Sequence, residues 1–166
     1  VDLIGERIDL AIRMGKLDDD ATLVARKLDE QSFGLYASPI YLGLHSAPKR
    51  PEELMQHTCV RMISDRGQVI PWKLLRGKAV WEGTAPGRLA LNSPSVIQQL
   101  LLDGAGIGAL PCRFAVEDVR LKRLVRVLPE WSFPLVPAWA VMPMRRYLPA
   151  KTRVFLAHLE QFMEKG

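Results

Sequence analysis

The segment of residues 88–111 most constrains the fold, because it predicts a strand, a helix and a second strand in immediate succession. A short strand leads into Ser93 and Pro94, which are typical of the N-cap and first position of a helix. An apolar stripe at helical spacing follows and ends at Gly104. Residues 107–110 then form a buried strand. Two strands joined by a helical crossover are predicted to be parallel.

The remainder of the chain alternates between predicted strands and helices, which indicates an α/β protein with a largely parallel sheet. Strands are expected at residues 9–14, 23–28, 33–38, 58–62, 72–75, 79–82, 124–128 and 138–142. Helices or helical turns are expected at 39–42, 50–55, 113–119 and 150–165. The first strand is expected to be buried on both faces. The last helix is expected to pack through Val154, Phe155, Leu159, Phe162 and Met163.

The composition limits the class of protein. With 48% hydrophobic and 25% charged residues among 166, the chain has the average balance of a folded soluble protein. Its cysteines, Cys59 and Cys112, are too far apart for a zinc motif and are expected to be buried thiols in a reducing cytosol. No run approaches the roughly 18 apolar residues of a membrane span. We therefore expect a cytoplasmic protein that does not bind a membrane.

No pattern of catalytic, metal or cofactor chemistry is evident. Residues 104–109 contain glycines spaced like a dinucleotide fingerprint, but the helix precedes them and a strand follows, which is the reverse of the required order. These glycines are instead expected to end a helix and to let the backbone pass close to a neighbour. The three histidines form no metal motif, and no nucleophile motif occurs. We expect neither an enzyme, nor a cofactor, nor a metal.

Two chain segments are candidates for binding a small molecule. Asn92 and Ser93 follow a strand and begin a helix, where free N–H groups attract anions and polar groups in α/β proteins. Arg13, Met14 and Gly15 end the first predicted strand in an equivalent place. The alternatives are that Ser93 only caps the helix and that Arg13 is only solvated. The middle of the chain, roughly residues 39–140, is long enough for a lobe of its own, which predicts a ligand cleft between two lobes.

The positive charge does not by itself indicate DNA binding. The chain has 23 Lys and Arg against 18 Asp and Glu, a net charge of +5. A charge of this size adds weak, salt-sensitive attraction to phosphates but reads no sequence. No DNA-binding motif is evident, and Arg145 and Arg146 are expected to serve subunit or domain contacts.

Several segments, taken in order, resemble the effector-binding domain of the bacterial LysR-type transcriptional regulators. No single motif is decisive, but together they cover nearly the whole chain. They are Asp9–Gly15 (DLAIRMG), Tyr36–Leu42 (YASPIYL), Pro51–Leu54 with His57–Cys59, Gly104–Pro111 (GAGIGALP), Leu124–Pro129 (LVRVLP) and Arg145–Phe155.

The resemblance implies a fold like that of type 2 periplasmic binding proteins, with two α/β lobes. The crossings would fall near Ala37–Ser38 and Met142–Pro143, so that residues 1–37 and 143–166 form lobe one and residues 38–142 lobe two. It also implies that a small effector, often an organic acid or an aromatic metabolite, binds between the lobes. The residues expected to line the cleft are Arg13, Met14, Gly15, Asn92, Ser93 and Ile107.

The resemblance further implies a homo-oligomer that binds DNA only through an N-terminal winged helix-turn-helix domain, which these residues do not include. The family's first strand-helix-strand unit of lobe one is also missing, so lobe one is expected to be incomplete at its N-terminal side. The alternative function is a solute-binding protein of a transport system with the same fold. An enzyme is a third class, for which the sequence offers no catalytic residue.

Overall fold

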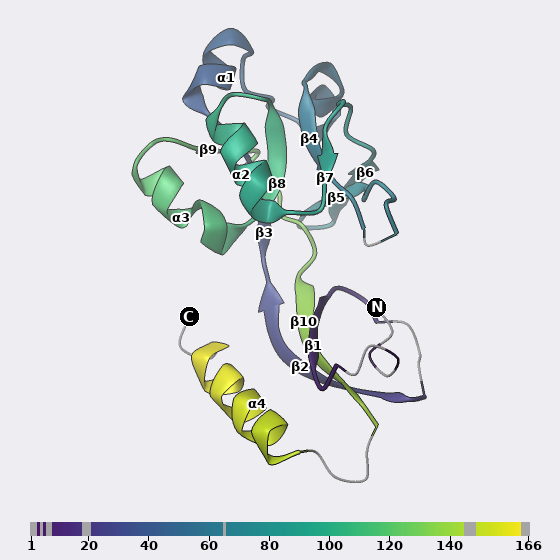
Figure 1. Cartoon of the computed structure of the whole chain (residues 1–166). Coiled ribbons are helices and arrows are strands. Elements are labelled where there is room, and N and C mark those ends of the chain that lie inside the picture. Colours follow the sequence, from purple (N-terminus) through teal and green to yellow (C-terminus); the bar gives the residue numbers. More distant parts are fainter. Residues whose placement is uncertain are drawn as a thin grey trace. The chain divides into compact units, whose positions relative to one another are not determined.

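The computed structural model contains two units (Figure 1). Unit 1 combines Val1–Gln31 with Leu135–Gly166, and unit 2 is Ser32–Pro134. The structure describes Leu3, Gly5 and residues 8–17, 21–64, 66–144 and 149–163. The chain passes from one unit to the other after Gln31 and again after Pro134. Both points come earlier in the chain than the crossings expected at Ala37–Ser38 and Met142–Pro143. The lobe boundaries implied by the resemblance stay a prediction.

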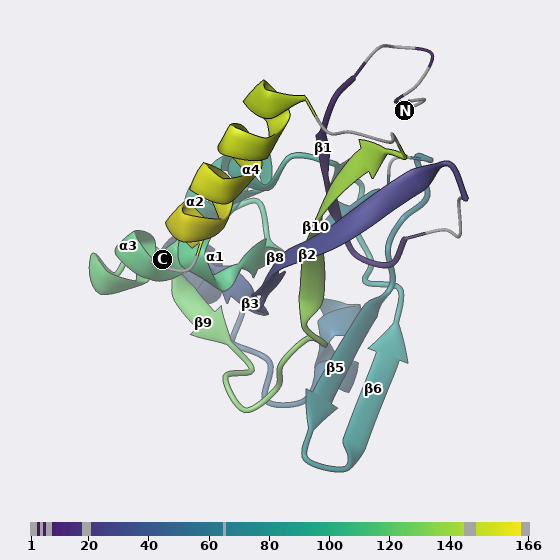
Figure 2. The same cartoon turned by 90° about the horizontal axis from the view of Figure 1, so that it is seen from below.

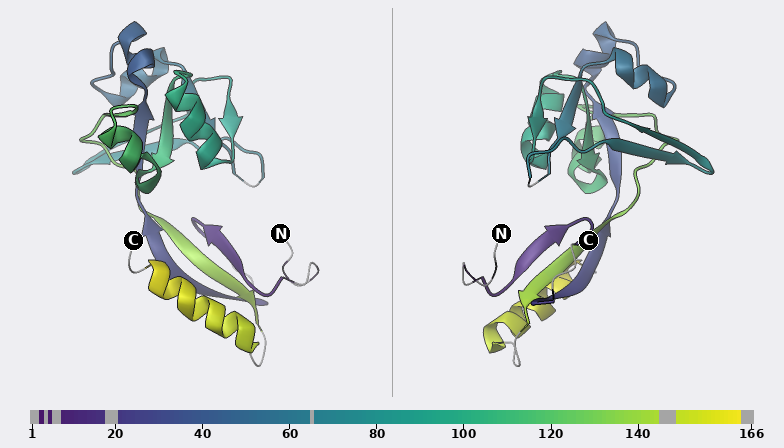
Figure 3. Two further views of the ribbon diagram at one scale, coloured as in Figure 1. Left: turned by 60° about the vertical axis from the view of Figure 1, so that its left-hand side comes forward. Right: turned by 90° about the vertical axis from the view of Figure 1, so that its right-hand side faces the viewer.

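Unit 1 contains an antiparallel sheet of order β1-β10-β2, with strands β1 (Ala11–Met14), β2 (Leu23–Gln31) and β10 (Val136–Pro143). Helix α4 (Ala150–Met163) runs along this sheet (Figure 3). The core joins Ala140 and Met142 of β10 to Leu156 of α4. The expectation that the first strand is buried on both faces is wrong. Alternate strand residues share one face of a sheet, and Ile12 and Met14 are about half exposed, at 49% and 48%, so their face of β1 is only partly covered.

The apolar face expected for the last helix is also wrong in part. Val154 and Phe155 are 69% and 54% exposed, whereas Thr152 and Leu156 are buried against the sheet. The side chains of Phe162 and Met163, which belonged to the expected face, lie outside the description, as do Arg145 and Arg146. An ion pair of 2.6 Å between Arg26 on β2 and Glu160 extends the packed row of positions 152, 156 and 160. Residues four apart lie on one face of a helix, so this row faces the sheet.

Unit 2 is built on a mixed sheet of order β7-β4-β8-β3-β9. Its strands are β3 (Phe33–Ala37), β4 (Cys59–Met62), β7 (Ala90–Leu91), β8 (Ile107–Pro111) and β9 (Val125–Val127). Strand β4 is parallel to both β7 and β8, so the predicted parallel relation of β7 and β8 is confirmed, with β4 between them. The pairings of β3 with β8 and β9 are antiparallel. The expectation of a largely parallel sheet was therefore wrong. Strand direction depends on which distant strands pair with each other, and hydrophobic patterns do not encode that pairing.

Helices and a hairpin complete unit 2. The elements are α1 (Pro39–Leu44), the 3-10 helix η1 (Pro51–Gln56), α2 (Pro94–Leu102), α3 (Cys112–Arg120) and the hairpin of β5 (Trp72–Arg76) and β6 (Ala79–Gly83) (Figure 2). Two core clusters use alternate strand residues, one containing Cys59 and Ile107 and the other containing Val60 and Leu110. Neighbouring strand residues point to opposite sides, so the sheet is covered on both faces. No helix in the described part of the chain is long and apolar enough to cross a membrane.

A buried carboxylate joins helices α2 and α3. Asp118 is 2% exposed and accepts a hydrogen bond of 2.6 Å from Gln98 of α2. Its other oxygen lies 2.6 Å from the guanidinium of Arg123. A buried charge is tolerated only with such partners. The contact holds α3 beside the middle of α2.

The glycines after α2 have the role expected from the sequence. Gly104 follows the C-cap Asp103 with φ +83°, and it ends the helix. Gly106 has φ +147° and passes so close to β4 that a Cβ would lie 2.3 Å from the Thr58 carbonyl oxygen. Only glycine allows this approach of the two backbones, which the pairing of β8 with β4 requires.

We predict that Gly106→Ala destabilises the chain by about 3 kcal/mol or more, because both the φ angle and the Thr58 carbonyl oppose a side chain. Gly43→Ala is the matched control. Gly43 lies in α1 with no atom within 4 Å of an added Cβ, so alanine should be neutral or slightly stabilising. Urea unfolding followed by circular dichroism measures both. Equal unfolding midpoints for the two variants would contradict the prediction.

A tyrosine and a histidine form a hydrogen-bonded pair between α1 and the end of η1. The hydroxyl of Tyr41 accepts a hydrogen bond of 3.0 Å from the Thr58 N–H, so its own proton is available to His57 Nδ1 at 3.1 Å. This arrangement requires a neutral imidazole. Burial, followed by the charge of His45, lowers the pKa of His57, while Glu53 acts in the opposite direction.

We predict that this pair makes the stability of the chain depend on pH below about 6.5, the ordinary pKa of histidine. The unfolded chain binds a proton on His57 more readily than the folded chain, so the contribution is complete above that pH and is lost as the pH falls. His57→Gln should flatten the dependence of the unfolding midpoint between pH 7 and 5.5. The control His45→Gln should retain most of it. An unchanged pH profile in His57→Gln would exclude this role.

Candidate functional site

The junction between β7 and α2 has the geometry of a polar binding site. Asn92 is exposed and directly follows β7, at the carboxyl ends of parallel strands. Ser93 occupies the N-cap, with φ −113° and ψ 111°, and its carbonyl accepts a hydrogen bond of 3.0 Å from the Ile97 N–H. The first N–H groups of a helix have no partner within it, and the helix dipole favours negative charge there. The junction can therefore hydrogen-bond an anion or a polar group.

The Ser93 hydroxyl does not make the capping hydrogen bond that the sequence suggested. The helix begins at the predicted residue, so the position is confirmed, but side-chain capping is not. In α1 the corresponding Ser38 hydroxyl does accept a hydrogen bond, of 3.3 Å, from the Tyr41 N–H. Both N-cap residues have an extended backbone, so the difference lies in the side chain of Ser93. The hydroxyl remains able to bind a ligand.

The end of β1 in unit 1 is held by hydrogen bonds from β10. The Gly15 N–H donates to the Pro137 carbonyl at 2.8 Å, and the indole Nε1 of Trp139 donates to the Gly15 carbonyl at 2.8 Å. Gly15 has φ +87°, a conformation that favours glycine. Met14 is 48% exposed and Arg13 is half-buried opposite Trp139. Arg13 and Met14 thus end β1, and Gly15 follows in a bend that these two hydrogen bonds hold.

Ile107 differs from the other expected site residues. Its side chain is 0% exposed and belongs to a core cluster of unit 2, and its N–H donates to the Thr58 carbonyl at 3.0 Å. Its position is explained by packing within unit 2. A contact between Ile107 and an effector stays a prediction.

Two residues near these segments were not identified from the sequence. One is Trp139, for which no sequence signal connects the indole to Gly15. Arg61 lies in β4 opposite Ala90 of β7, and its Nε is buried without a hydrogen-bond partner. Arg61 could have been noticed in the sequence because it is an arginine within an otherwise apolar four-residue strand. In the part of the chain that the structure describes, no group of three or more His, Cys, Asp or Glu is placed to hold a metal ion.

Comparison with known proteins decides the family. Residues 1–164 match the LysR substrate binding domain. The chain belongs to this family. The family resemblance inferred from the sequence motifs is confirmed, and so is the α/β class.

The LysR substrate-binding domain described here is similar to several curated regulators. It is 33% identical over 167 residues to the HTH-type transcriptional regulator PtxR of Pseudomonas aeruginosa, covering 98% of this chain and 51% of PtxR. It is 35% identical over 164 residues to the regulator DmlR of Escherichia coli, covering 98% of this chain and 52% of DmlR. The chain spans about half the length of these relatives. Both are transcriptional regulators and not enzymes.

Solved regulatory domains have the same fold as this LysR domain. The regulatory domain of CrgA, a LysR-type transcriptional regulator from Neisseria meningitidis, matches with a TM-score of 0.83 at 29% identity, covering 98% of this chain and 79% of that one. The regulatory domain of AphB from Vibrio vulnificus matches with a TM-score of 0.77 at 26% identity, covering 95% and 76%. The fold expected from the resemblance, that of type 2 periplasmic binding proteins, is confirmed.

We predict that Trp139→Phe loosens the turn at Gly15, because phenylalanine keeps the ring but removes the hydrogen bond to the Gly15 carbonyl. The expected cost is about 1 kcal/mol of stability, with faster hydrogen exchange at the amides of Met14 and Gly15. Trp131→Phe, in unit 2, is the control and should leave this exchange unchanged. Equal exchange at Gly15 in the two variants would contradict the role of the indole.

Proposed function

We propose that this LysR domain is the effector sensor of a transcriptional regulator. In this proposal a small organic acid or aromatic metabolite binds between the two lobes. Arg13, Met14 and Gly15 contribute from one lobe and Asn92, Ser93 and Ile107 from the other. The β7–α2 junction is the observation that carries the proposal, because it combines free helix N–H groups, an exposed amide and a hydroxyl not used for capping. Such a junction recognises a carboxylate by hydrogen bonds and by the helix dipole.

The response to the effector is a shift between conformations. An effector changes the regulator only if it binds one arrangement of the lobes more tightly than the other. A Gly15 bend held by two hydrogen bonds and a helix α2 bonded to α3 suit this role, because less of the binding energy is then lost in ordering loops.

The partners of the whole protein follow from the same proposal. The regulator acts in the cytoplasm as a homo-oligomer, and it contacts DNA through an N-terminal winged helix-turn-helix domain outside residues 1–166. The match covers 51% of PtxR and 52% of DmlR, so about half of each relative lies outside it and is long enough for such a domain. The transport alternative is not retained, because the named relatives are regulators.

We predict that a panel of small carboxylates and aromatic acids, such as succinate and benzoate, contains members that raise the melting temperature of the chain. For the member with the largest effect, Asn92→Ala and Ser93→Ala should each weaken binding at least about fivefold, the effect of one lost hydrogen bond of about 1 kcal/mol. Isothermal titration calorimetry measures the affinities.

Gln99→Ala is the matched control for Asn92→Ala. It removes an amide from α2, the helix that follows Asn92, at an exposed position whose side chain bonds the C-cap Asp103. It should leave the affinity unchanged. No shift in melting temperature with any panel member, or equal affinities of all three variants, would sink the proposal.

A further inference from the structure

The β5–β6 hairpin of unit 2 has an open strand edge. The two strands form a sheet of their own, and the hairpin projects from the rest of unit 2 (Figures 2 and 3). Strand β5 is anchored, because Trp72 and Leu74 are buried in a core cluster. Strand β6 has no second neighbour among the strands that the structure describes. An exposed strand edge of this kind is a template for pairing with another strand.

The hydrogen bonds of β5 show which backbone groups of β6 face outward. In an antiparallel pair of strands, facing residues alternate between those that exchange hydrogen bonds and those that point away from each other. Leu75 exchanges both of its backbone hydrogen bonds with Ser132, at 2.8 and 3.0 Å, so it points away from β6. Val80 faces Leu75 in the register. The N–H and C=O of Val80 therefore point away from β5, and neither has a partner in the described part of the chain.

The side chains of β6 fit this edge to a second copy of itself. When two β6 strands pair antiparallel with Val80 opposite Val80, Lys78 of each copy lies opposite Glu82 of the other. Opposite charges that face each other across two strands stabilise their pairing. The same register places Ala79 opposite Trp81, a small side chain beside a large one. Val80, which is 59% exposed in the single chain, is then covered by its own copy.

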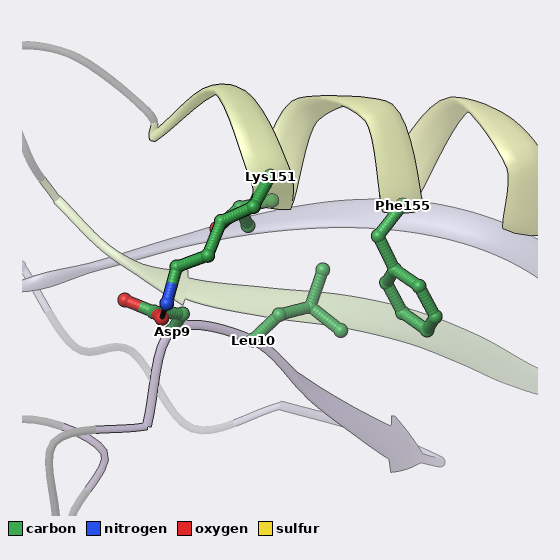
Figure 4. Close-up of a pocket in the computed structure, with 5 residues that line it drawn as sticks. Asp9, Leu10, Lys151 and Phe155 are labelled. Atoms are coloured by element: carbon green, nitrogen blue, oxygen red, sulfur yellow. Dashed lines mark ion pairs between the residues drawn. The ribbon is translucent and has the colours of Figure 1, made fainter.

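Both charges of β6 are available for this contact. Some lysines of the chain are paired within it, as Figure 4 shows for Lys151, whose Nζ lies 2.6 Å from Asp9 Oδ2. Lys78, in contrast, is exposed and has no ion pair among the described residues. Glu82 is exposed and lies 3.7 Å from Lys73, beyond hydrogen-bond distance. A second copy can therefore offer each of them a closer partner.

From these observations we propose that the outer edge of β6 is an interaction surface between two copies of this chain. The two strands pair antiparallel about a two-fold axis at Val80, so that one surface patch serves both copies. Backbone hydrogen bonds at Val80 and two Lys78–Glu82 ion pairs hold the contact. Because the contact is small, the dimer is weak and reversible. The surface goes beyond the proposed effector site, since it contains no residue of the segments at Gly15 or Asn92.

The test is sedimentation velocity of the chain over a series of concentrations. The wild-type chain should shift from monomer toward dimer as its concentration rises. Val80→Pro removes the outward N–H and keeps the bonds between β5 and β6, because proline is tolerated where the N–H of an edge strand faces solvent. It should weaken self-association at least about fivefold. Val80→Thr keeps both the shape and the N–H, so it is the matched control and should associate like wild type.

Charge reversal distinguishes this surface from any other. Lys78→Glu and Glu82→Lys should each weaken self-association, because each variant then meets its own copy with like charges. Mixed together, the two variants regain both opposite-charge pairs, so they should associate as well as wild type does. Recovery in the mixture also shows that both variants are folded. Lys122→Glu makes the same change of charge at an exposed position elsewhere in unit 2 and should associate like wild type.

Three results would each overturn the proposal. A chain that stays monomeric at every concentration leaves the β6 edge to another protein or to solvent. Association that Val80→Pro leaves unchanged assigns the dimer to a different surface. A mixture of the two charge variants that associates no better than either alone excludes the Lys78–Glu82 register.

The result is independent of the proposed effector site. Asn92→Ala should leave self-association unchanged, because Asn92 lies outside the hairpin. Failure of the dimer test would remove the β6 contact and leave the effector proposal standing. Failure of the acid panel would have the opposite effect.

Discussion

Unit 2 depends on the parallel pairing of β4 with both β7 and β8. This pairing places the start of α2 at the carboxyl ends of the strands, where helix N–H groups and the Asn92 amide are available to a ligand. The pairing of β8 with β4 is possible only because residue 106 is glycine: the backbone there passes so close to the Thr58 carbonyl that no Cβ would fit. The Asp118 contacts with Gln98 and Arg123 then hold α3 against α2. The candidate site is thus a consequence of close backbone packing more than of any one side chain.

In unit 1 the candidate site segment at Gly15 is held by an antiparallel sheet. The Gly15 turn is fixed from both sides by β10, through the Pro137 carbonyl and the Trp139 indole. Helix α4 packs through the small Thr152 and through Leu156, which leaves Phe155 more than half exposed. The Gly15 turn is therefore held by tertiary contacts between β1 and β10.

The sequence was most informative where a local signal has one physical meaning. Pro94 after a capping residue and Gly104 after an apolar stripe define the start and end of α2, because proline suits a first helical turn and glycine adopts a positive φ. The family motifs were equally informative, since several short segments in a fixed order are specific even when each alone is weak. The site segments at Arg13–Gly15 and Asn92–Ser93 were identified from their positions at the ends of predicted strands, and their role in binding stays a proposal.

The sequence by itself determined the elements, the α/β class and the LysR family. Only the tertiary structure decided strand direction, the buried face of α4, the free hydroxyl of Ser93, the indole contact to Gly15 and the exposed outer edge of β6. The physical reason is the range of the interactions. Caps, glycines and apolar periodicity act over a few residues and can be read along the chain. Whether Val154 or Leu156 is buried, and whether a hydroxyl finds a partner, depends on which distant strand lies opposite.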